Sequence, residues 1–420
     1  MKTNCFAILV CLAFLSAGCS RLGGSGVAPS PTPGTPPPGS PPPPPPTSVV
    51  GPDGFLLVNG QKFFPVGYYA EGFDGYASHE YAASTLAGAG FNTMYTEHDQ
   101  MNVADYTTFL NRCNTLGIKN LLSFYGDINP SYLNSFKSFP SLLSWSIADD
   151  GDTRYTPAEI QARHDLVRAL DPDHVTGSAL TTGVFSEDVK LRQYTAATDV
   201  SALEWYPVLE DDPENDETKY TYQIISRIVS ASVKQGKSGM VILQTYNWKD
   251  NYPDSPYVWP SAAQIRAMSY TSVVAGAKGV LYYTLKDYTE NSTINLTQPA
   301  LWNATADFAA KMRNTLAPVV LNGTRINLTE RDNKPYVHAS YWIYNGRQYL
   351  IAVNMNRANS GDNGRRTVGF ATGLEGAMIN LFSDYPATLT KTSNGIVSGT
   401  MEPLEVQVYQ VTSSGSPPLP

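Results

Sequence analysis

Apolar runs typical of β-strands alternate with amphipathic runs typical of helices along residues 49–320. Eight such βα units within about 270 residues match the size of a (β/α)8 barrel, in which the strands pair in parallel. An open doubly wound sheet would need a glycine-rich phosphate loop after the first strand, and the GYYAE sequence at 67–71 is not one. The predicted strands are residues 64–69, 92–96, 119–125, 142–149, 175–181, 200–207, 240–246 and 279–285.

Helix start signals support this alternation. Thr156, Pro157 and Glu159 form a capping box with proline at the first helical position, and Ser261 with Gln264 forms a second box. We therefore expect helices to begin at these two places, each directly after a predicted strand and its loop.

The pattern changes after residue 320. Short alternating runs separated by turns such as Asn345-Gly346 predict a small antiparallel β-sandwich over residues 321–412. Near the start of the folded part, FLLVNGQKFF contains an Asn-Gly turn and predicts a hairpin, which we expect to lie across the bottom of the barrel.

The N-terminal sequence predicts export. Residues 1–18 have the composition of a secretory signal, and the small residues before Cys19 resemble a bacterial lipobox, which would make Cys19 the site of lipidation. Residues 19–48 form a proline-rich linker that favours an extended conformation. We expect a protein of the bacterial cell envelope, anchored in a membrane by lipid and facing outside the cytoplasm. Residues 413–420 predict a disordered tail.

Charge, cysteine and histidine content restrict the binding partners and cofactors that we expect. The net charge is −8 and no basic run is present, so nucleic acid is a poor candidate partner. Once Cys5, Cys11 and Cys19 are removed or lipidated, only Cys113 remains, and the exported part has no intrachain disulfide. The five histidines lack metal-ligand spacing, so we expect no metal and no cofactor. We expect a monomer.

Two adjacent carboxylates end the fourth predicted strand, in FPSLLSWSIADDGD. Asp149 and Asp150 follow an apolar run, at the strand end where barrel enzymes place their reacting groups. A structural alternative is that they only cap the next helix. Because Thr156 already caps that helix, we favour a functional role for the two aspartates.

Over residues 51–412 the chain resembles glycoside hydrolases of the clan A type. The segments that carry the resemblance are FLLVNGQKFFPVGYY, LAGAGFNTMYTE, PSLLSWSIADDGD, DVSALEWYPV, AGAKGVLYYTLKD and MEPLEVQVYQV. The resemblance implies a (β/α)8 barrel with a C-terminal β-sandwich that hydrolyses an extracellular oligo- or polysaccharide. It places Asp150 at the position of the general acid, with Asp149 before it.

The chain departs from the clan's pattern at one catalytic position. The clan's nucleophile is a glutamate that ends strand seven, and Gln244 stands there. An amide cannot act as that nucleophile. Glu204, near the end of strand six, is our preferred second carboxylate. Two alternatives stay open: inversion with a more distant carboxylate, for which Glu71, Glu97 and Asp99 are candidates, and attack by a 2-acetamido group of the substrate oriented by Asp149.

A non-catalytic alternative is a glycan-binding lipoprotein that kept the barrel and lost the chemistry. The abundant aromatic residues fit either function, because aromatic faces stack on sugar rings. Gln244 and Glu97 are further candidates for substrate contacts. The candidate sugar platforms near predicted strand ends are Tyr68, Tyr69, Tyr206, Tyr246, Trp248 and Tyr283.

Overall fold

The computed structural model describes residues 48–97, 100–124, 126–210, 217–331, 334–359, 361–373, 376–392 and 394–412. These residues belong to one compact unit. The predicted signal, Cys19, nearly all of the linker and the tail lie outside them. No helix in the described ranges is both long and apolar enough to span a membrane.

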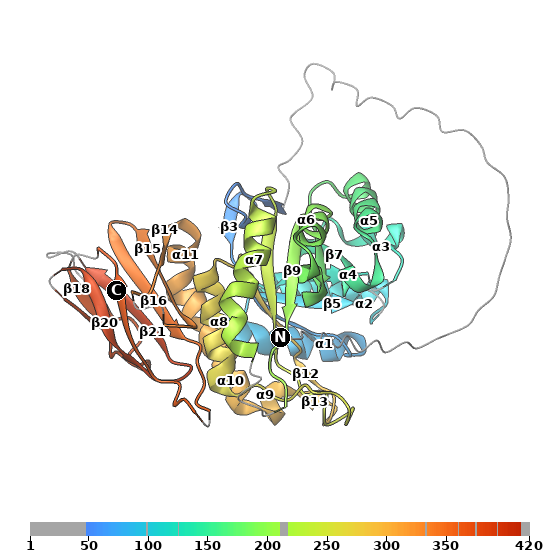
Figure 1. The fold of residues 1–420 in the computed structure, drawn as a ribbon. Coiled ribbons are helices and arrows are strands. Elements are labelled where there is room, and N and C mark those ends of the chain that lie inside the picture. Colours follow the sequence, from blue (N-terminus) through green and yellow to red (C-terminus); the bar gives the residue numbers. More distant parts are fainter. Residues whose placement is uncertain are drawn as a thin grey trace, which may run out of the picture. The chain divides into compact units, whose positions relative to one another are not determined.

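Eight parallel strands close into a barrel in the order β10-β11-β4-β5-β6-β7-β8-β9 (Figure 1). Each predicted strand coincides with one of them, with ends that differ by two residues at most. The predicted (β/α)8 barrel is therefore confirmed. The strands are β4 Val66–Tyr69, β5 Thr93–Glu97, β6 Lys119–Ser123, β7 Leu142–Ala148, β8 Val175–Leu180, β9 Val200–Trp205, β10 Ser238–Gln244 and β11 Val280–Tyr283.

Helices surround the barrel. The capping boxes at Thr156 and Ser261 are both formed and open α5 and α8, as the sequence predicts. The helices are α1 Gly75–Gly88, α2 Val103–Leu116, α3 Pro130–Phe136, α4 Gly151–Arg154, α5 Pro157–Leu170, α6 Asp188–Ala196, α7 Thr221–Val233, α8 Ala262–Ala275, α9 Ile294–Thr297, α10 Pro299–Lys311 and α11 Ala317–Asn322. Cys113 is a buried free thiol in α2.

The predicted hairpin closes the N-terminal end of the barrel. Strands β1 Ser48–Val50, β2 Leu56–Val58 and β3 Gln61–Phe63 form a small antiparallel sheet. Asn59 and Gly60 join β2 to β3 with φ of 50° and 76°, as a two-residue hairpin turn requires. Leu56 is buried in one cluster with Val175 and Val200, which begin β8 and β9. The hairpin therefore forms the floor of the barrel interior.

Two antiparallel sheets follow the barrel. One has the order β14-β15-β16-β21-β18 and the other β17-β20-β19. Leu350 and Ala352 of the first sheet share a buried cluster with Val368 and Phe370 of the second, so the sheets pack as a sandwich. Their bounds are β14 Thr324–Leu328, β15 Val337–Tyr344, β16 Arg347–Asn354, β17 Arg366–Ala371, β18 Ala377–Asn380, β19 Thr390–Lys391, β20 Ile396–Met401 and β21 Val406–Thr412.

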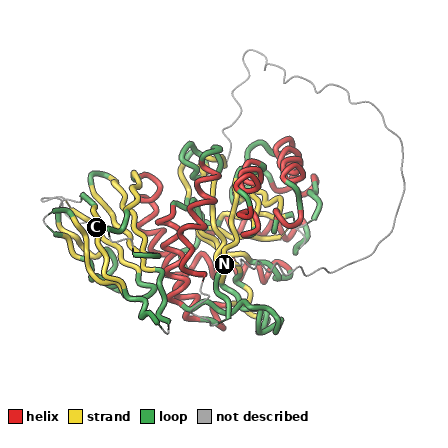
Figure 2. Tube along the Cα trace, viewed as in Figure 1, coloured by secondary structure: helices red, strands yellow, loops and turns green. Residues whose placement is uncertain are grey.

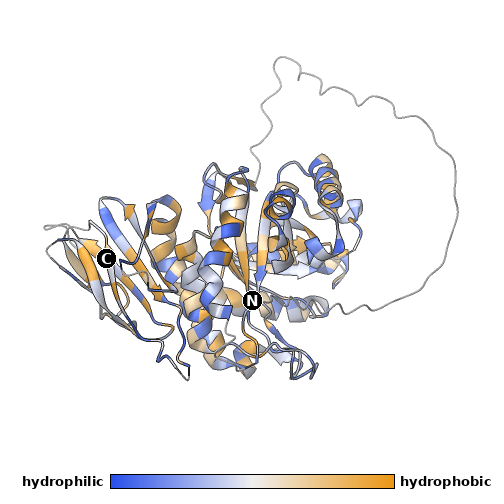
Figure 3. Ribbon diagram, in the orientation of Figure 1, coloured by the Kyte–Doolittle hydropathy of each residue, from blue (hydrophilic) through white to orange (hydrophobic). Residues whose placement is uncertain are grey.

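Helix α8 joins the barrel and the sandwich. It packs on β10 of the barrel and on β15 and β16 of the sandwich, and nearly all of its residues are buried. Thr271 donates a hydrogen bond to Sδ of Met355, and Ser340 donates one to the carbonyl of Val274. Figure 2 shows the yellow strands of the sandwich beside these red helices, and Figure 3 shows hydrophobic residues along many of the strands. The barrel and the first sheet thus share one core.

Candidate active site

Acidic residues gather at the carboxyl ends of four barrel strands. Glu71 follows β4, Glu97 ends β5, Asp149 and Asp150 follow β7, and Glu204 is the second-last residue of β9. The charges of Asp149 and Asp150 act on Glu204, and those of Glu97 and Asp150 act on Glu71. The structure therefore brings the three predicted catalytic carboxylates together, with Glu71 and Glu97 beside them.

Glu204 and Asp150 form the central pair. The two carboxyl groups lie close enough for a side-chain hydrogen bond to act on the pKa of Glu204. Burial, followed by the charges of Asp149 and Asp150, raises the pKa of Glu204 well above its ordinary value. Arg154 Nη2 lies 3.4 Å from Asp150 Oδ2 on the partly exposed side of the pair. Burial therefore favours the protonated form of Glu204.

Asp149 and Glu71 also favour their protonated forms. Burial, and then the charge of Glu71, raise the pKa of Asp149 to about 7. Burial raises the pKa of Glu71 to about 7 as well, although hydrogen bonds from Tyr283 and Tyr288 oppose the shift. The Tyr288 hydroxyl donates to Glu71 Oε1 at 3.0 Å. Desolvation together with like charge is the arrangement that acid–base sites use.

A left-handed turn positions Asp150. Its φ of 49° and ψ of 38° lie in a region that aspartate tolerates better than most residues. Gly151 follows against β8, where a Cβ would come within 2.5 Å of Ser178 Oγ. Asp152 then accepts hydrogen bonds from the Thr181 backbone N–H at 2.7 Å and hydroxyl at 3.0 Å. Asp150 occupies the N-cap position of α4, but its side chain makes no cap hydrogen bond.

Aromatic rings stand beside the carboxylates. Tyr206 contacts Tyr246 and Tyr283, with ring centroids 5.2 Å and 5.8 Å apart. Trp248 contacts Tyr246 at 4.8 Å, so the four predicted platforms form one cluster. Tyr257 belongs to the same cluster, with its ring centroid 5.6 Å from that of Tyr246. It comes from the loop after β10 and was not among the predicted platforms. The charge of Glu204 contributes to the raised pKa of Tyr206, which places this ring next to the carboxyl pair.

Tyr68 does not belong to this cluster. Its side chain is fully buried between the barrel and the helices, where it contacts Phe91 and shares a 2.8 Å hydrogen bond with Thr305. Adjacent strand residues face opposite ways, so Tyr69 points into the barrel instead. Tyr69 stacks on Tyr95 with centroids 3.8 Å apart. The prediction that Tyr68 is a sugar platform is therefore wrong, because its ring does not reach the barrel interior.

Gln244 is a structural residue. Its amide donates to the carbonyls of Val208 and Val258 at 2.9 Å each, and its Oε1 accepts from the Val208 N–H at 2.9 Å. The side chain has no exposed surface. It therefore ties the loops after β9 and β10 to the end of the barrel, in contrast to the sugar-binding role expected from the sequence.

Glu97 lies at the edge of the carboxylate group. Gln100 Nε2 donates to Glu97 Oε2 at 2.9 Å, and Gln100 Oε1 lies 2.8 Å from Nε2 of the buried His79. These contacts fix the Glu97 carboxyl next to Glu71. Across the described ranges, no group of three or more His, Cys, Asp or Glu residues is arranged to hold a metal ion.

No family model matches the sequence, and no curated protein does. Solved structures match over most of the chain. A protein described as "Glycoside hydrolase" has a TM-score of 0.61 and 14% identity, and the match covers 88% of this chain and 98% of that one. The chain has a glycoside hydrolase fold.

Two further solved structures match the same fold. A glycoside hydrolase family 5 protein from Bacteroides vulgatus has a TM-score of 0.57 and 13% identity, over 88% of this chain and 94% of that one. A γ-CGTase from Alkalophilic bacillus clarkii has a TM-score of 0.53 and 12% identity, over 81% of this chain and 65% of that one. Sequence identities this low establish the fold alone.

Proposed function

We propose that this protein hydrolyses glycosidic bonds in an extracellular oligo- or polysaccharide. The observation that carries the proposal is the close pair of Glu204 and Asp150 at the carboxyl ends of the barrel strands, where the two side chains act on each other. Glycoside hydrolysis needs two carboxyl groups, one protonated and one not, on either side of the scissile bond. The glycosidase-like fold and the adjacent aromatic rings support the same reaction.

The proposed roles reverse those expected from the sequence. Glu204 gives its proton to the glycosidic oxygen as the C–O bond breaks, and an Asp150 oxygen bonds to the sugar C1. Glu204 then takes a proton from water, whose oxygen attacks C1 and releases Asp150. The negative charge of Asp149 helps to keep the proton on Glu204.

The closeness of the pair favours retention of configuration. Carboxyl groups within reach of a shared hydrogen bond are nearer to the separation of about 5–5.5 Å found in retaining enzymes than to the 6.5–9.5 Å of inverting ones. Tyr206, Tyr246, Trp248 and Tyr283 supply ring faces on which the sugar stacks.

A substrate screen tests the proposal. Aryl glycosides and soluble polysaccharides are incubated with the wild type, Glu204→Gln and Asp150→Asn, and released aglycone or reducing ends are measured. We expect hydrolysis by the wild type and a loss of about 10²–10⁴-fold in each variant. Asp188→Asn, whose side chain is 74% exposed in α6, is the matched control and keeps full activity. Unchanged activity in Glu204→Gln refutes the assigned roles.

Gln244 favours a second candidate, a glycan-binding protein without catalysis. An amide occupies the position where the resembled clan has its nucleophile, and the structure uses that amide to hold loops together. In that case the wild type binds polysaccharide and releases no reducing ends in the same screen.

We further propose that Cys19 anchors the protein in a bacterial membrane. The proposal rests on the lipobox-like sequence before this cysteine and on the proline-rich residues after it. Labelling with a fatty-acid analogue tests it: the wild type takes up label and fractionates with membranes. A Cys19→Ser variant that remains equally labelled would contradict the assignment.

A further inference from the structure

A pocket of about 550 Å³ lies between the segments that follow β4 and β11, two neighbouring strands of the barrel. Its volume falls within the range of about 300–1,000 Å³ that is typical of small-molecule sites. The short strands β12 Lys286–Asp287 and β13 Ser292–Thr293 contribute to one side, and Figure 1 shows them beside α1. We call it the distal pocket, and its lining includes Asp74, Ser78, Tyr81, Lys286, Asn291 and Leu296.

The distal pocket begins next to the carboxylate group of the candidate active site. Gly72 lines the pocket and directly follows Glu71 in the chain. The Tyr288 hydroxyl donates to Glu71 Oε1 at 3.0 Å, and a Cβ at Gly72 would lie 3.0 Å from Cε1 of the same tyrosine. One tyrosine ring therefore spans the distance between the Glu71 carboxyl and the pocket. A long ligand that occupies the candidate active site can continue past this ring into the distal pocket.

Exposed apolar side chains form part of the pocket wall. Tyr81 of α1 is 42% exposed and Leu296 of α9 is 64% exposed. Asn295 Nδ2 donates to the Tyr81 hydroxyl oxygen at 3.1 Å, which holds the tyrosine from the α9 side. Large apolar side chains that remain exposed around one hollow are typical of a binding site. An aromatic ring beside an aliphatic side chain suits the C–H face of a sugar.

Charged groups line the same pocket. Lys286 Nζ donates to the Gly72 carbonyl at 2.8 Å and lies 5.4 Å from the centre of the Phe73 ring. These contacts position the ammonium, and an ammonium has further N–H donors for a ligand. Asp74 is the N-cap residue of α1, but its exposed carboxylate makes no cap hydrogen bond. The pocket thus presents a donor and an acceptor beside its apolar wall, and a sugar hydroxyl can bind to either.

We propose that the distal pocket binds a sugar unit of the same glycan chain whose bond is cleaved beside Glu204 and Asp150. The inference rests on the proposed hydrolysis and names its substrate class, a neutral chain of several sugar units. Carboxylates outnumber the Lys286 ammonium along this path, since Glu71 and Asp74 join the central pair, and they disfavour an acidic chain. Contacts to a remote sugar unit raise kcat/KM only for a substrate that is long enough to make them.

Dependence on chain length tests the distal pocket. The value of kcat/KM is measured for the wild type, Tyr81→Ala and Leu296→Ala on a short aryl glycoside and on a long oligosaccharide of the same sugar. We expect the ratio of the long-substrate value to the short-substrate value to fall about fivefold in each variant, as the loss of one stacking contact implies. Tyr81→Phe keeps the ring and should keep the wild-type ratio. Unfolding midpoints verify that each variant is folded.

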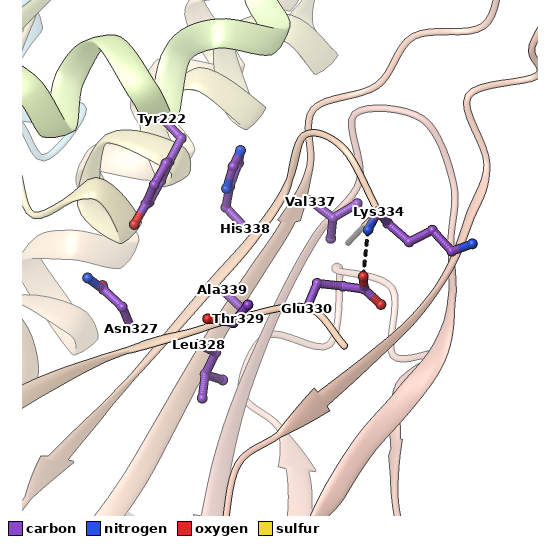
Figure 4. A pocket seen from close by; sticks show the side chains of 9 residues that line it. All are labelled: Tyr222, Asn327, Leu328, Thr329, Glu330, Lys334, Val337, His338 and Ala339. Carbon is purple, nitrogen blue, oxygen red and sulfur yellow. Dashed lines mark hydrogen bonds between the residues drawn. The ribbon is translucent and has the colours of Figure 1, made fainter. Parts of the chain in front are cut away.

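Tyr222→Ala is the matched tyrosine control. Tyr222 stacks on His338 in a separate pocket that α7 forms with β14 and β15, and none of the residues that line it belongs to the distal pocket (Figure 4). We therefore expect the wild-type ratio in this variant. An equal fall of the ratio in Tyr222→Ala and in Tyr81→Ala would show a general effect on the fold and would overturn the proposal.

A binding measurement separates failure of the distal pocket from failure of the proposed hydrolysis. If the wild type hydrolyses nothing, it is run through gels that contain a soluble glucan, mannan, xylan, galactan or polygalacturonate. Retardation by a neutral polysaccharide that is weaker in Tyr81→Ala than in Tyr222→Ala supports the pocket even though hydrolysis has failed. Retardation that is absent, equal in the two variants or strongest with polygalacturonate overturns it. If the wild type is active, an unchanged ratio in Tyr81→Ala and Leu296→Ala overturns the pocket and leaves the proposed hydrolysis standing.

Discussion

Gln244 ends a barrel strand, as the sequence predicts, but its role is not the predicted one. Met240 and Ile242 face the barrel interior, and Gln244 follows the same alternation at the end of β10. Its partners are the backbone groups of Val208 and Val258, which come from two loops. Nothing in the local sequence signals that these loops fold back over the strand end, so this role could be found only in three dimensions.

A carboxylate at position 244 should damage the fold without raising the activity of the protein. In Gln244→Glu, two buried carbonyls lose their donors and face a negative charge. We expect a loss of about 2–5 kcal/mol in the free energy of unfolding. Chemical denaturation measures it, with the exposed Gln223→Glu as control. A Gln244→Glu protein that is as stable as the wild type and more active would contradict the structural role.

Asp149 should reduce stability at neutral and alkaline pH. Its pKa is about 7 in the folded protein and close to 3.9 in an unfolded chain. The folded state therefore binds more protons between these values, and stability falls as the pH rises from about 4 to 7. Asp149→Asn removes this penalty, with an expected gain of about 2–4 kcal/mol above pH 7 and little gain at pH 4. Thermal unfolding at both pH values measures it. An equal gain at pH 4 and pH 8 would exclude this cause.

The sequence alone could not decide which of two neighbouring tyrosines faces the barrel interior. Tyr68 and Tyr69 have the same side chain and are both almost fully buried, because barrel strands are covered on both faces. Period-two alternation states that only one of them faces the interior but does not state which. Only the structure assigns Tyr69 to that side.

The elements themselves were predictable, since each strand is a short apolar run between turn and cap signals. The sequence located all eight barrel strands and two capping boxes. The left-handed turn at Asp150 was not predicted. It depends on Gly151 fitting against Ser178 and on Asp152 reaching Thr181, and both contacts involve the neighbouring βα unit.

Strand β4 offers a test of close packing between elements. A Cβ at Gly67 would lie 1.9 Å from the backbone oxygen of Thr93 in β5. Gly67→Ala should therefore separate the two strands and cost more than about 3 kcal/mol. Gly88→Ala at the end of α1 meets no atom within 4 Å and is expected to be neutral or slightly stabilising. Urea denaturation compares them, and equal stability of the two variants would argue against this packing.

For the molecule as a whole, the barrel and the sandwich share a core across α8. The predicted boundary at residues 320 and 321 falls within α11, and Trp342 and Ile351 of the first sheet belong to the same buried cluster as the barrel helices. A single cooperative transition in calorimetry is therefore expected, because neither part can unfold without exposing the other. Two resolved transitions would indicate independent domains.

The central claim is that the paired carboxyls of Glu204 and Asp150 cleave a glycosidic bond. The most direct test is the value of kcat/KM for Glu204→Gln and for the wild type on one substrate found by the screen, at pH 6–7. The account predicts a loss of at least about 10²-fold, with an unfolding midpoint equal to or above that of the wild type. A stable Glu204→Gln protein that hydrolyses the substrate at the wild-type rate would contradict it.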